Sequence, residues 1–273
     1  MTFWRAQERA GESGGKLVLR VEDLDGDRCR PEFRAAISED LHWFGLRWDE
    51  GPDVGGAFGP YLQSERRESY LAAWRKLRDA ALIYPCTCSR QDVLQSAGAP
   101  HHENEEPVYP GKCRPPSGTI SGLESPSGRN WRFRVPEGEA LEFDDQRFGR
   151  QRAIAGFNFG DFIVWRKDDV PAYQLAVVTD DAAMQITEVV RGADLLLSTF
   201  RQFAALSGSG FERAALLSHR VDQGCGRATA RQAARRAELE RTANGWRRSG
   251  GTAETLLAVI ERRIPKAQSP NPR

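Results

Sequence analysis

Hydrophobic residues recur along the chain at two spacings, which predict strands and helices in alternation. Leu17, Leu19 and Val21 share one face of a strand over residues 16–21, because every second side chain of a strand points to the same face. The same criterion predicts further strands at 131–135, 142–148, 162–165, 172–178 and 186–190. Helical spacing predicts helices at 1–12, 31–44, 64–77, 198–206 and 252–263. This alternation is typical of an α/β core with a mostly parallel sheet.

The pattern also predicts which strands are neighbours and where regular structure is absent. Two pairs of the expected strands should be neighbours: 131–135 with 142–148 in a small antiparallel insertion, and 162–165 with 172–178 around a turn at Asp168 and Asp169. Residues 96–127 are rich in Pro, Gly and Ser, and predict a loop with little regular structure. Residues 224–248 break the pattern, because seven of these 25 residues are Arg and a helix there would have no apolar stripe.

Composition restricts the class of protein. The 273 residues are 40% hydrophobic and 28% charged, which is enough to bury a core. The 39 basic and 38 acidic residues leave a net charge of +1, so bulk charge does not predict binding to nucleic acid. No apolar run is long enough for a membrane span or a signal peptide. Five cysteines are too few for a disulfide framework, and we expect a soluble cytoplasmic monomer.

Carboxylates follow the first predicted strand directly. The chain continues from Val21 into Glu22, Asp23, Leu24 and Asp25. Ligands of open α/β sheets bind beyond the carboxyl ends of strands, so Glu22 is placed to hold an ammonium group. The alternative is an acidic turn that caps the next helix.

Three cysteines lie close together in sequence. Cys86 and Cys88 are two residues apart, and Cys113 follows after the predicted loop. Three thiolates can converge on one tetrahedral ion such as zinc, and His101 or His102 would supply the fourth ligand. The alternative is three unrelated buried thiols.

A single arginine ends a later strand. Arg191 precedes Gly192, where the backbone can approach a ligand closely. Its guanidinium could bind a carboxylate through two parallel hydrogen bonds. A structural ion pair with Asp194 or Asp181 is the alternative.

Five segments of the chain match sequence motifs of one protein family, in the order in which that family has them. They are residues 19–25 (family LRIEDLD), 84–90 (YPCTCSR), 109–113 (YPGTC), 172–181 (AYQLAVVVDD) and 189–196 (VVRGADLL). From about residue 3 to residue 206, the chain resembles the catalytic domain of class I glutamyl-tRNA synthetases. It is most similar to their short paralogues, the glutamyl-Q tRNA(Asp) synthetases.

The resemblance implies a role for several residues. Glu22 would pair with the α-ammonium of glutamate, and Tyr173 and Arg191 would bind its side-chain carboxylate. One zinc ion per chain would be held by Cys86, Cys88, Tyr109 and Cys113, so the family favours Tyr109 over a histidine. The family activates glutamate with ATP to glutamyl-adenylate and transfers it to the queuosine base of tRNA(Asp).

The resemblance also implies an organisation of the chain. The expected fold is α/β, a Rossmann-like class I catalytic domain with a zinc-binding insertion, in which the first strand is missing. Residues 1–82 would form the first part of the catalytic domain, 83–150 the zinc-binding, acceptor-stem-type insertion, 151–210 the second part, and 211–273 a C-terminal region with a final helix. Without its first strand the sheet would leave residues 16–21 with an unpaired edge, which predicts self-association.

Both ATP motifs of the family are unrecognisable. Residues 1–9 align with the helix that follows the family's HLGH-type motif, and residues 222–236, where a KMSKS-type motif should fall, contain no lysine. Helix amides and a lysine or histidine normally receive the phosphates, so we expect little or no glutamate activation. The alternative functions are a non-catalytic zinc-containing protein that binds tRNA or glutamate, and a fragment of a glutamyl-tRNA synthetase.

Residues 224–248 admit a second explanation. Codons permitted by residues 231–240, read one nucleotide later, encode Asp-Lys-Arg-His-Asp-Ala-Leu-Ser-Leu, which resembles the family's AKRHDALSL. The hypothesis is a pair of compensating small insertions or deletions between about residues 218 and 251. A solvated, Arg-rich helix is the alternative. The nucleotide sequence decides between them: codons whose shifted frame does not encode Lys-Arg-His would end the hypothesis.

Overall fold

The computed structural model describes residues 2–25, 29, 31–96, 108–209, 218–221 and 258–263. The α-helices are α1 (Thr2–Glu12), α2 (Pro31–Trp43), α3 (Arg67–Asp79), α4 (Arg90–Ser96), α5 (Tyr173–Ala183) and α6 (Leu196–Ser209), with short 3₁₀ helices η1 (Gln63–Glu65) and η2 (Ala193–Leu195). The strands are β1 (Lys16–Val21), β2 (Ile83–Cys86), β3 (Asn130–Phe133), β4 (Ala140–Asp145), β5 (Gly149–Ile154), β6 (Phe162–Trp165), β7 (Glu188–Arg191), β8 (Ser218–Val221) and β9 (Ala258–Arg263). His101, His102 and residues 224–248, with the frame-shift hypothesis, lie outside the described residues.

Most elements predicted from hydrophobic spacing are present. Strand β1 has the predicted bounds, and α1, α2, α3, β6, β7 and α6 lie within a few residues of theirs. Residues 108–127 of the predicted loop contain no helix or strand. Among the described residues, no helix combines the length and apolar character that crossing a membrane requires.

The larger sheet has six strands in the order β1-β9-β7-β8-β4-β5. Strands β7 and β8 are parallel over four residue pairs, and β4 and β8 are parallel at a single pair. The pairs β1–β9, β9–β7 and β4–β5 are antiparallel. The prediction of a mostly parallel sheet is therefore wrong for this sheet, because β9 runs against both of its neighbours and β4–β5 is a hairpin.

Strand β9 corrects the last part of the helix predicted at 252–263; residues 252–257 lie outside the described residues. Residues 258–263 pair with the whole length of β1, from Ala258 opposite Val21 to Arg263 opposite Lys16. So short a segment fits either element, and backbone partners on β1 and β7 decide the choice here. On its other side, β1 is bonded through Leu19 to Glu50 and through Val21 to Tyr61. The expected unpaired edge at residues 16–21, and the self-association that it predicted, therefore lose their structural basis.

Helix α5 corrects the prediction of a strand at 172–178. Trp165 forms one antiparallel bridge with Pro171, as a strand pair would, but the chain turns into a helix at Tyr173. Every residue from Gln174 to Asp181 is buried. A helix that is covered on all sides has no polar face, so its sequence lacks the helical periodicity that would distinguish it from a buried strand.

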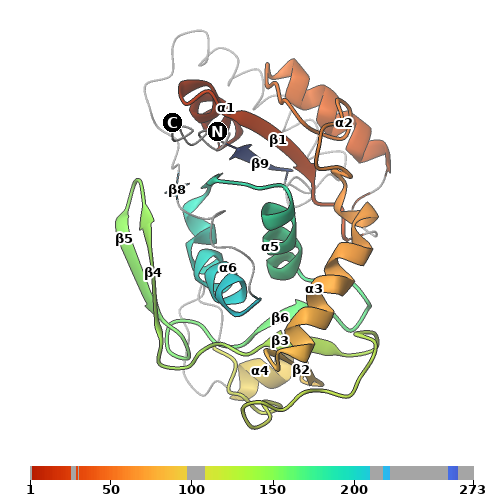
Figure 1. The fold of residues 1–273 in the computed structure, drawn as a ribbon, viewed down its shortest axis with the longest axis vertical. Helices are drawn as coiled ribbons and strands as arrows, with labels where there is room; N and C mark the ends of the chain where they lie inside the picture. The colour runs from red at the N-terminus through yellow and green to blue at the C-terminus, as the bar shows by residue number, and fades with distance from the viewer. Residues whose placement is uncertain are drawn as a thin grey trace, which may run out of the picture.

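A second sheet contains three antiparallel strands in the order β2-β3-β6. The predicted pairing of 131–135 with 142–148 is wrong, because β3 pairs with β2 and β6 while β4 pairs with β5. Trp74 of α3 packs edge-to-face on Trp131 of β3, with ring centroids 4.8 Å apart, in the largest hydrophobic cluster. Figure 1 shows α5 and α6 in the middle of the molecule, between β1 and β9 and the three-stranded sheet.

Candidate functional site

The end of β1 contains a buried arginine that faces three carboxylates. Arg20 is 1% exposed, and its Nη1 donates to Asp181 Oδ1 at 2.8 Å. Its guanidinium also lies 3.5 Å from Glu22 Oε1 and 3.5 Å from Asp180 Oδ2. Arg20 thus ties the end of β1 to the buried side of α5. The sequence suggested Asp181 as a possible ion-pair partner of Arg191; in the structure Asp181 forms an ion pair with Arg20.

Asp180 joins this cluster to the segment before α3. Its carboxylate accepts hydrogen bonds from Arg66 Nε at 2.6 Å, from Gln63 Nε2 at 2.8 Å and from the Tyr70 hydroxyl at 2.9 Å. Buried charges are tolerated when they are paired and hydrogen-bonded in this way. The network fixes η1, α3 and α5 against one another next to Glu22, and sequence analysis did not assign Asp180 any role.

Burial also perturbs the titration of Glu22, the first carboxylate after β1. Burial raises the pKa of Glu22 to about 8; the charge of Arg20 lowers it, and the charges of Asp181 and Asp180 raise it further. A carboxyl group in this environment gains from a positively charged ligand, because such a ligand restores the ionised form. The chemistry at Glu22 therefore suits an ammonium group.

Tyr173 and Arg191 lie in the same neighbourhood as Glu22. Tyr173 is the first residue of α5, and Arg191 is the last residue of β7 and 5% exposed. Burial raises the pKa of Tyr173, the charge of Glu22 raises it further, and the charge of Arg191 lowers it. The phenol therefore lies within electrostatic reach of both side chains. Arg191 Nη1 donates to Gln202 Oε1 of α6 at 3.1 Å, which orients the guanidinium.

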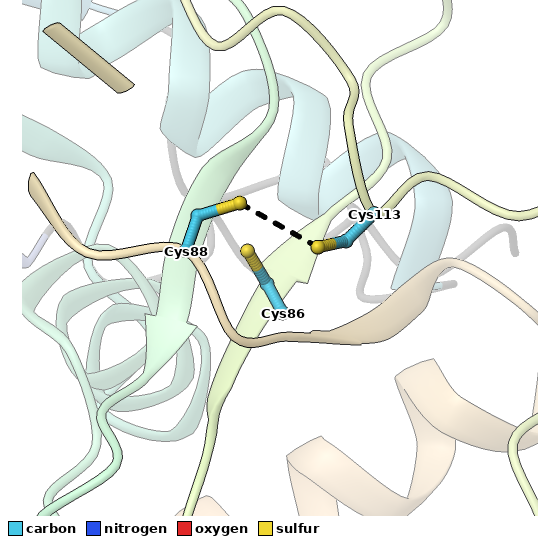
Figure 2. Close-up of side chains that lie close together, drawn as sticks. All are labelled: Cys86, Cys88 and Cys113. Carbon is cyan, nitrogen blue, oxygen red and sulfur yellow. Dashed lines mark hydrogen bonds between the residues drawn. The ribbon is translucent and has the colours of Figure 1, made fainter. Parts of the chain in front are cut away.

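A second cluster contains three cysteines (Figure 2). Cys86 ends β2, Cys88 follows it, and Cys113 comes after the loop. The three sulfurs lie within 4.8 Å of one another, and those of Cys88 and Cys113 are 3.5 Å apart. Figure 2 shows the three side chains pointing toward one another, Cys86 and Cys88 from one stretch of the chain and Cys113 from another.

Tyr109 occupies the fourth corner of this cluster. Its hydroxyl lies 3.5 Å from Cys86 Sγ and 3.6 Å from Cys88 Sγ, and it accepts a hydrogen bond from the Cys113 amide at 2.8 Å. Burial raises the pKa of the Cys88 thiol. Burial opposes ionisation of Cys113, but hydrogen bonds led by that of the Thr87 amide lower its pKa to about 6.

These positions fit a tetrahedral zinc ion. Zn–S bonds of about 2.3 Å place two ligand sulfurs about 3.8 Å apart, and a Zn–O bond of about 2.1 Å places the oxygen about 3.6 Å from each sulfur. The sulfur and hydroxyl separations above approach both values. Three thiols and one phenol form a donor set whose soft sulfur atoms favour zinc over magnesium or calcium.

Arg132 also lies against this cluster, and no sequence motif predicted a role for it. In the predicted strand Arg132 alternates with Trp131 and Phe133, and that alternation is typical of a solvent-facing residue. In the structure Arg132 is 7% exposed, and its Nε donates to Cys86 Sγ at 3.3 Å. The signal that could have identified Arg132 is its position in a strand, β3, that pairs with the strand ending at the candidate ligand Cys86.

Comparison with known proteins gives consistent matches. The sequence profile of the tRNA synthetases class I (E and Q), catalytic domain, matches residues 5–224. The chain is 46% identical over 219 residues to the glutamyl-Q tRNA(Asp) synthetase of Nitratidesulfovibrio vulgaris, which covers 80% of this chain and 66% of that protein. It is 47% identical over 196 residues to the glutamyl-Q tRNA(Asp) synthetase of Symbiobacterium thermophilum, covering 71% of this chain and 60% of that protein.

The fold also has solved counterparts. The crystal structure of a glutamate tRNA ligase from Elizabethkingia meningosepticum, in complex with its amino acid, superposes with a TM-score of 0.67 at 24% identity. The match covers 86% of this chain and 49% of that one. The chain thus spans two thirds or less of the length of the relatives and the structure that it matches.

Proposed function

This chain belongs to the class I tRNA synthetases for glutamate and glutamine, whose catalytic-domain profile matches most of its length, and from that premise we propose that it recognises and activates glutamate. Glu22 would pair with the α-ammonium group of the amino acid. Tyr173 and Arg191 would bind the side-chain carboxylate. The two relatives named glutamyl-Q tRNA(Asp) synthetase support this substrate over glutamine.

The observation that carries the proposal is that charges of both signs act on the Tyr173 phenol. The charge of Glu22 raises its pKa and the charge of Arg191 lowers it, so both side chains lie within electrostatic reach of the phenol. An amino acid with a second carboxylate matches this arrangement, because its ammonium and its side chain carry complementary charges at two ends. A guanidinium binds a carboxylate more strongly than it binds a neutral amide, so Arg191 would select glutamate over glutamine.

The reaction would follow the chemistry of the family. The α-carboxylate of glutamate attacks the α-phosphorus of ATP, the bond to the β-phosphate oxygen breaks, and pyrophosphate leaves as glutamyl-adenylate forms. In a second step the glutamyl group would pass to the queuosine base of tRNA(Asp), and AMP would leave. The residues of this chain assigned here bind and orient glutamate; none is assigned to the phosphates of ATP.

Zinc would have a structural role in this proposal. Cys86, Cys88, Tyr109 and Cys113 would hold one ion in the insertion at 83–150, between the two parts of the catalytic domain at 1–82 and 151–210. A bound zinc ion links β2 to the loop before Cys113 and contributes its binding free energy to the folding of that segment. Metal analysis of the purified protein that finds no zinc would contradict this part of the proposal.

Arg191 is the residue to test first. Arg191→Gln should weaken glutamate binding about 100-fold, because a charge-assisted pair contributes on the order of 1.5–3 kcal/mol. Isothermal titration with glutamate measures this directly. Arg67→Gln is the matched control, since Arg67 forms an exposed ion pair with Asp169 at 2.6 Å and should leave the affinity within about twofold. Equal affinities of the wild-type protein for glutamate and glutamine would contradict the proposed role of Arg191.

A second candidate function is glutamate binding without adenylate formation. It is favoured by residues 222–236, which contain no lysine where the family has its second ATP motif. Exchange of pyrophosphate into ATP that depends on glutamate separates the two candidates. Exchange above background supports activation; glutamate binding without exchange supports the second candidate.

A further inference from the structure

Arg132 is a buried cation without a carboxylate partner among the described residues. It is 7% exposed. Its Nε donates to Cys86 Sγ at 3.3 Å, and its Nη1 donates to the backbone oxygen of Asp161 at 3.0 Å. Its guanidinium carbon lies 3.9 Å from the ring centroid of Tyr109. The groups that contact the guanidinium are therefore a sulfur, a carbonyl oxygen and an aromatic face.

This environment requires a negative charge to balance it. An isolated cation in the interior costs several kcal/mol unless an anion lies close to it. The cysteine cluster supplies such an anion when it holds a metal ion, because three thiolates on one Zn²⁺ leave a net charge of −1 on the complex.

We propose that Arg132 is the positioning and charge-balancing residue of the cysteine cluster. It holds Cys86 by an N–H···S hydrogen bond, orients the ring of Tyr109 by stacking on it, and offsets the excess negative charge of the occupied site. This inference rests on the zinc proposed above and adds to it the residue that selects for the metal-bound form. Groups that hydrogen-bond to metal ligands in this way typically change metal affinity 10- to 100-fold.

The scaffold behind Arg132 makes this geometry rigid. The carboxylate of Asp161 accepts a hydrogen bond from the Tyr84 hydroxyl and another from the Val135 amide at 2.9 Å. Asp161 itself is 5% exposed. Its backbone oxygen is therefore a fixed acceptor, and Arg132 is held at both ends, by Asp161 and by Cys86.

Arg132 differs from a neighbouring arginine in the groups that accompany its positive charge. Arg114, a second guanidinium near this scaffold, lies 3.5 Å from Asp161 Oδ2 and 3.0 Å from Glu137 Oε2, so carboxylates accompany its charge. Arg132 has no such carboxylate within the described part of the chain. Of these two arginines, Arg132 is thus the one whose charge the ligand set must balance.

Three variants test the proposal. Arg132→Met removes the charge and the hydrogen bond, and Arg132→Lys keeps the charge but loses the planar fork. Arg78→Met is the matched control, because Arg78 lies over the Trp74 ring at 5.1 Å and donates to the Leu123 carbonyl at 2.9 Å without contacting a sulfur. Zinc affinity is measured by competition with a chromophoric chelator, and the cobalt-substituted proteins are compared by absorption spectroscopy.

The expected results differ among the variants. Arg132→Met should bind zinc 10- to 100-fold more weakly than the wild-type protein, and Arg132→Lys should lie between them. Arg78→Met should stay within about twofold of the wild-type affinity. The sulfur-to-cobalt charge-transfer band should move to lower energy in both Arg132 variants, because the lost N–H···S bond no longer stabilises the thiolate electrons. A purely structural role for Arg132 would leave that band unmoved.

Each other outcome has a definite meaning. Wild-type protein that binds neither zinc nor cobalt overturns the zinc proposal and the role of Arg132 together. Wild-type protein that binds zinc, with unchanged affinity and cobalt spectrum in folded Arg132→Met, overturns the role of Arg132 alone. If Arg132→Met does not fold, Arg132→Lys decides: wild-type affinity and an unmoved band overturn the proposal.

Discussion

The charged network around Arg20 and the cysteine cluster around Cys86 place polar groups in the interior by different means. The charged network gathers residues from β1, η1, α3 and α5, and its carboxylates and guanidiniums balance one another through ion pairs. The cysteine cluster gathers residues from β2, β3 and one loop, and within the described residues Arg132 brings the cation and no carboxylate touches it. The charges around Arg20 are therefore balanced by side chains of the fold itself, whereas we propose that a bound zinc ion completes the cysteine cluster.

Asp180→Ala should have the largest effect and should damage the charged network around Arg20 alone. It leaves Arg66 and the Tyr70 hydroxyl without their buried acceptor, and breaking such a network costs about 3–5 kcal/mol. Chemical denaturation followed by circular dichroism measures the loss. Asp79→Ala removes an exposed partner of Arg78 and should cost less than about 1 kcal/mol. Equal losses in the two variants would show that the network contributes nothing beyond an exposed ion pair.

The pH dependence of stability should come next in size. The pKa of Glu22 is about 8 in the folded protein and lies near 4.5 when unfolded. The folded state therefore binds the Glu22 proton more tightly than the unfolded chain does, so the contribution of Glu22 to stability is largest below pH 4.5 and falls as the pH rises toward 8. The loss between pH 5.5 and 8 should be on the order of 3 kcal/mol.

A variant isolates this contribution. Glu22→Gln cannot titrate, so the free energy of unfolding of this variant should vary less with pH than that of the wild-type protein over the same range. Saturating glutamate should also reduce the slope in the wild-type protein if its ammonium group pairs with Glu22. A slope that persists unchanged in Glu22→Gln would assign the pH dependence to other groups.

Metal removal should have the smallest effect on global stability, and it should be confined to the cysteine cluster. A chelator, or Cys88→Ser, should speed amide hydrogen exchange at Cys88 and Cys113 about tenfold or more and leave α5 unchanged, because the cluster has its own small hydrophobic group. Hydrogen exchange detected by mass spectrometry resolves the two regions. Cys29→Ser, a cysteine outside the cluster, should keep the zinc. Faster exchange in α5 would show that the two regions are coupled.

The two regions also differ in what their sequences could reveal. The cysteines are close in sequence and of one residue type, so their grouping is visible without a structure, and the separations among them follow from β2 and one loop. The charged network around Arg20, in contrast, joins residues that are more than a hundred positions apart in sequence. Arg20 and Asp181 are 161 positions apart, and nothing in either local pattern pairs them.

The errors at α5 and β9 have different physical origins. Helix α5 is a short, largely apolar segment, and periodicity distinguishes helix from strand only when one face is exposed to water. Burial on every side erased the helical signal of α5. Backbone partners on β1 and β7 set the conformation of β9, since hydrogen bonding in a sheet depends on neighbours distant in sequence.

The sequence by itself determined the strand at 16–21, the main amphipathic helices, the family and the residue types offered to glutamate and to a metal. These features depend on local spacing and on motifs whose residues are consecutive. Only the tertiary structure decided that Arg20 faces Asp181, that Asp180 joins η1 and α3 to α5, and that Arg132 lies against Cys86 and Tyr109. The reason is that the free energy of a buried charge depends on which groups surround it in space, and those neighbours come from elements that the chain brings together only on folding.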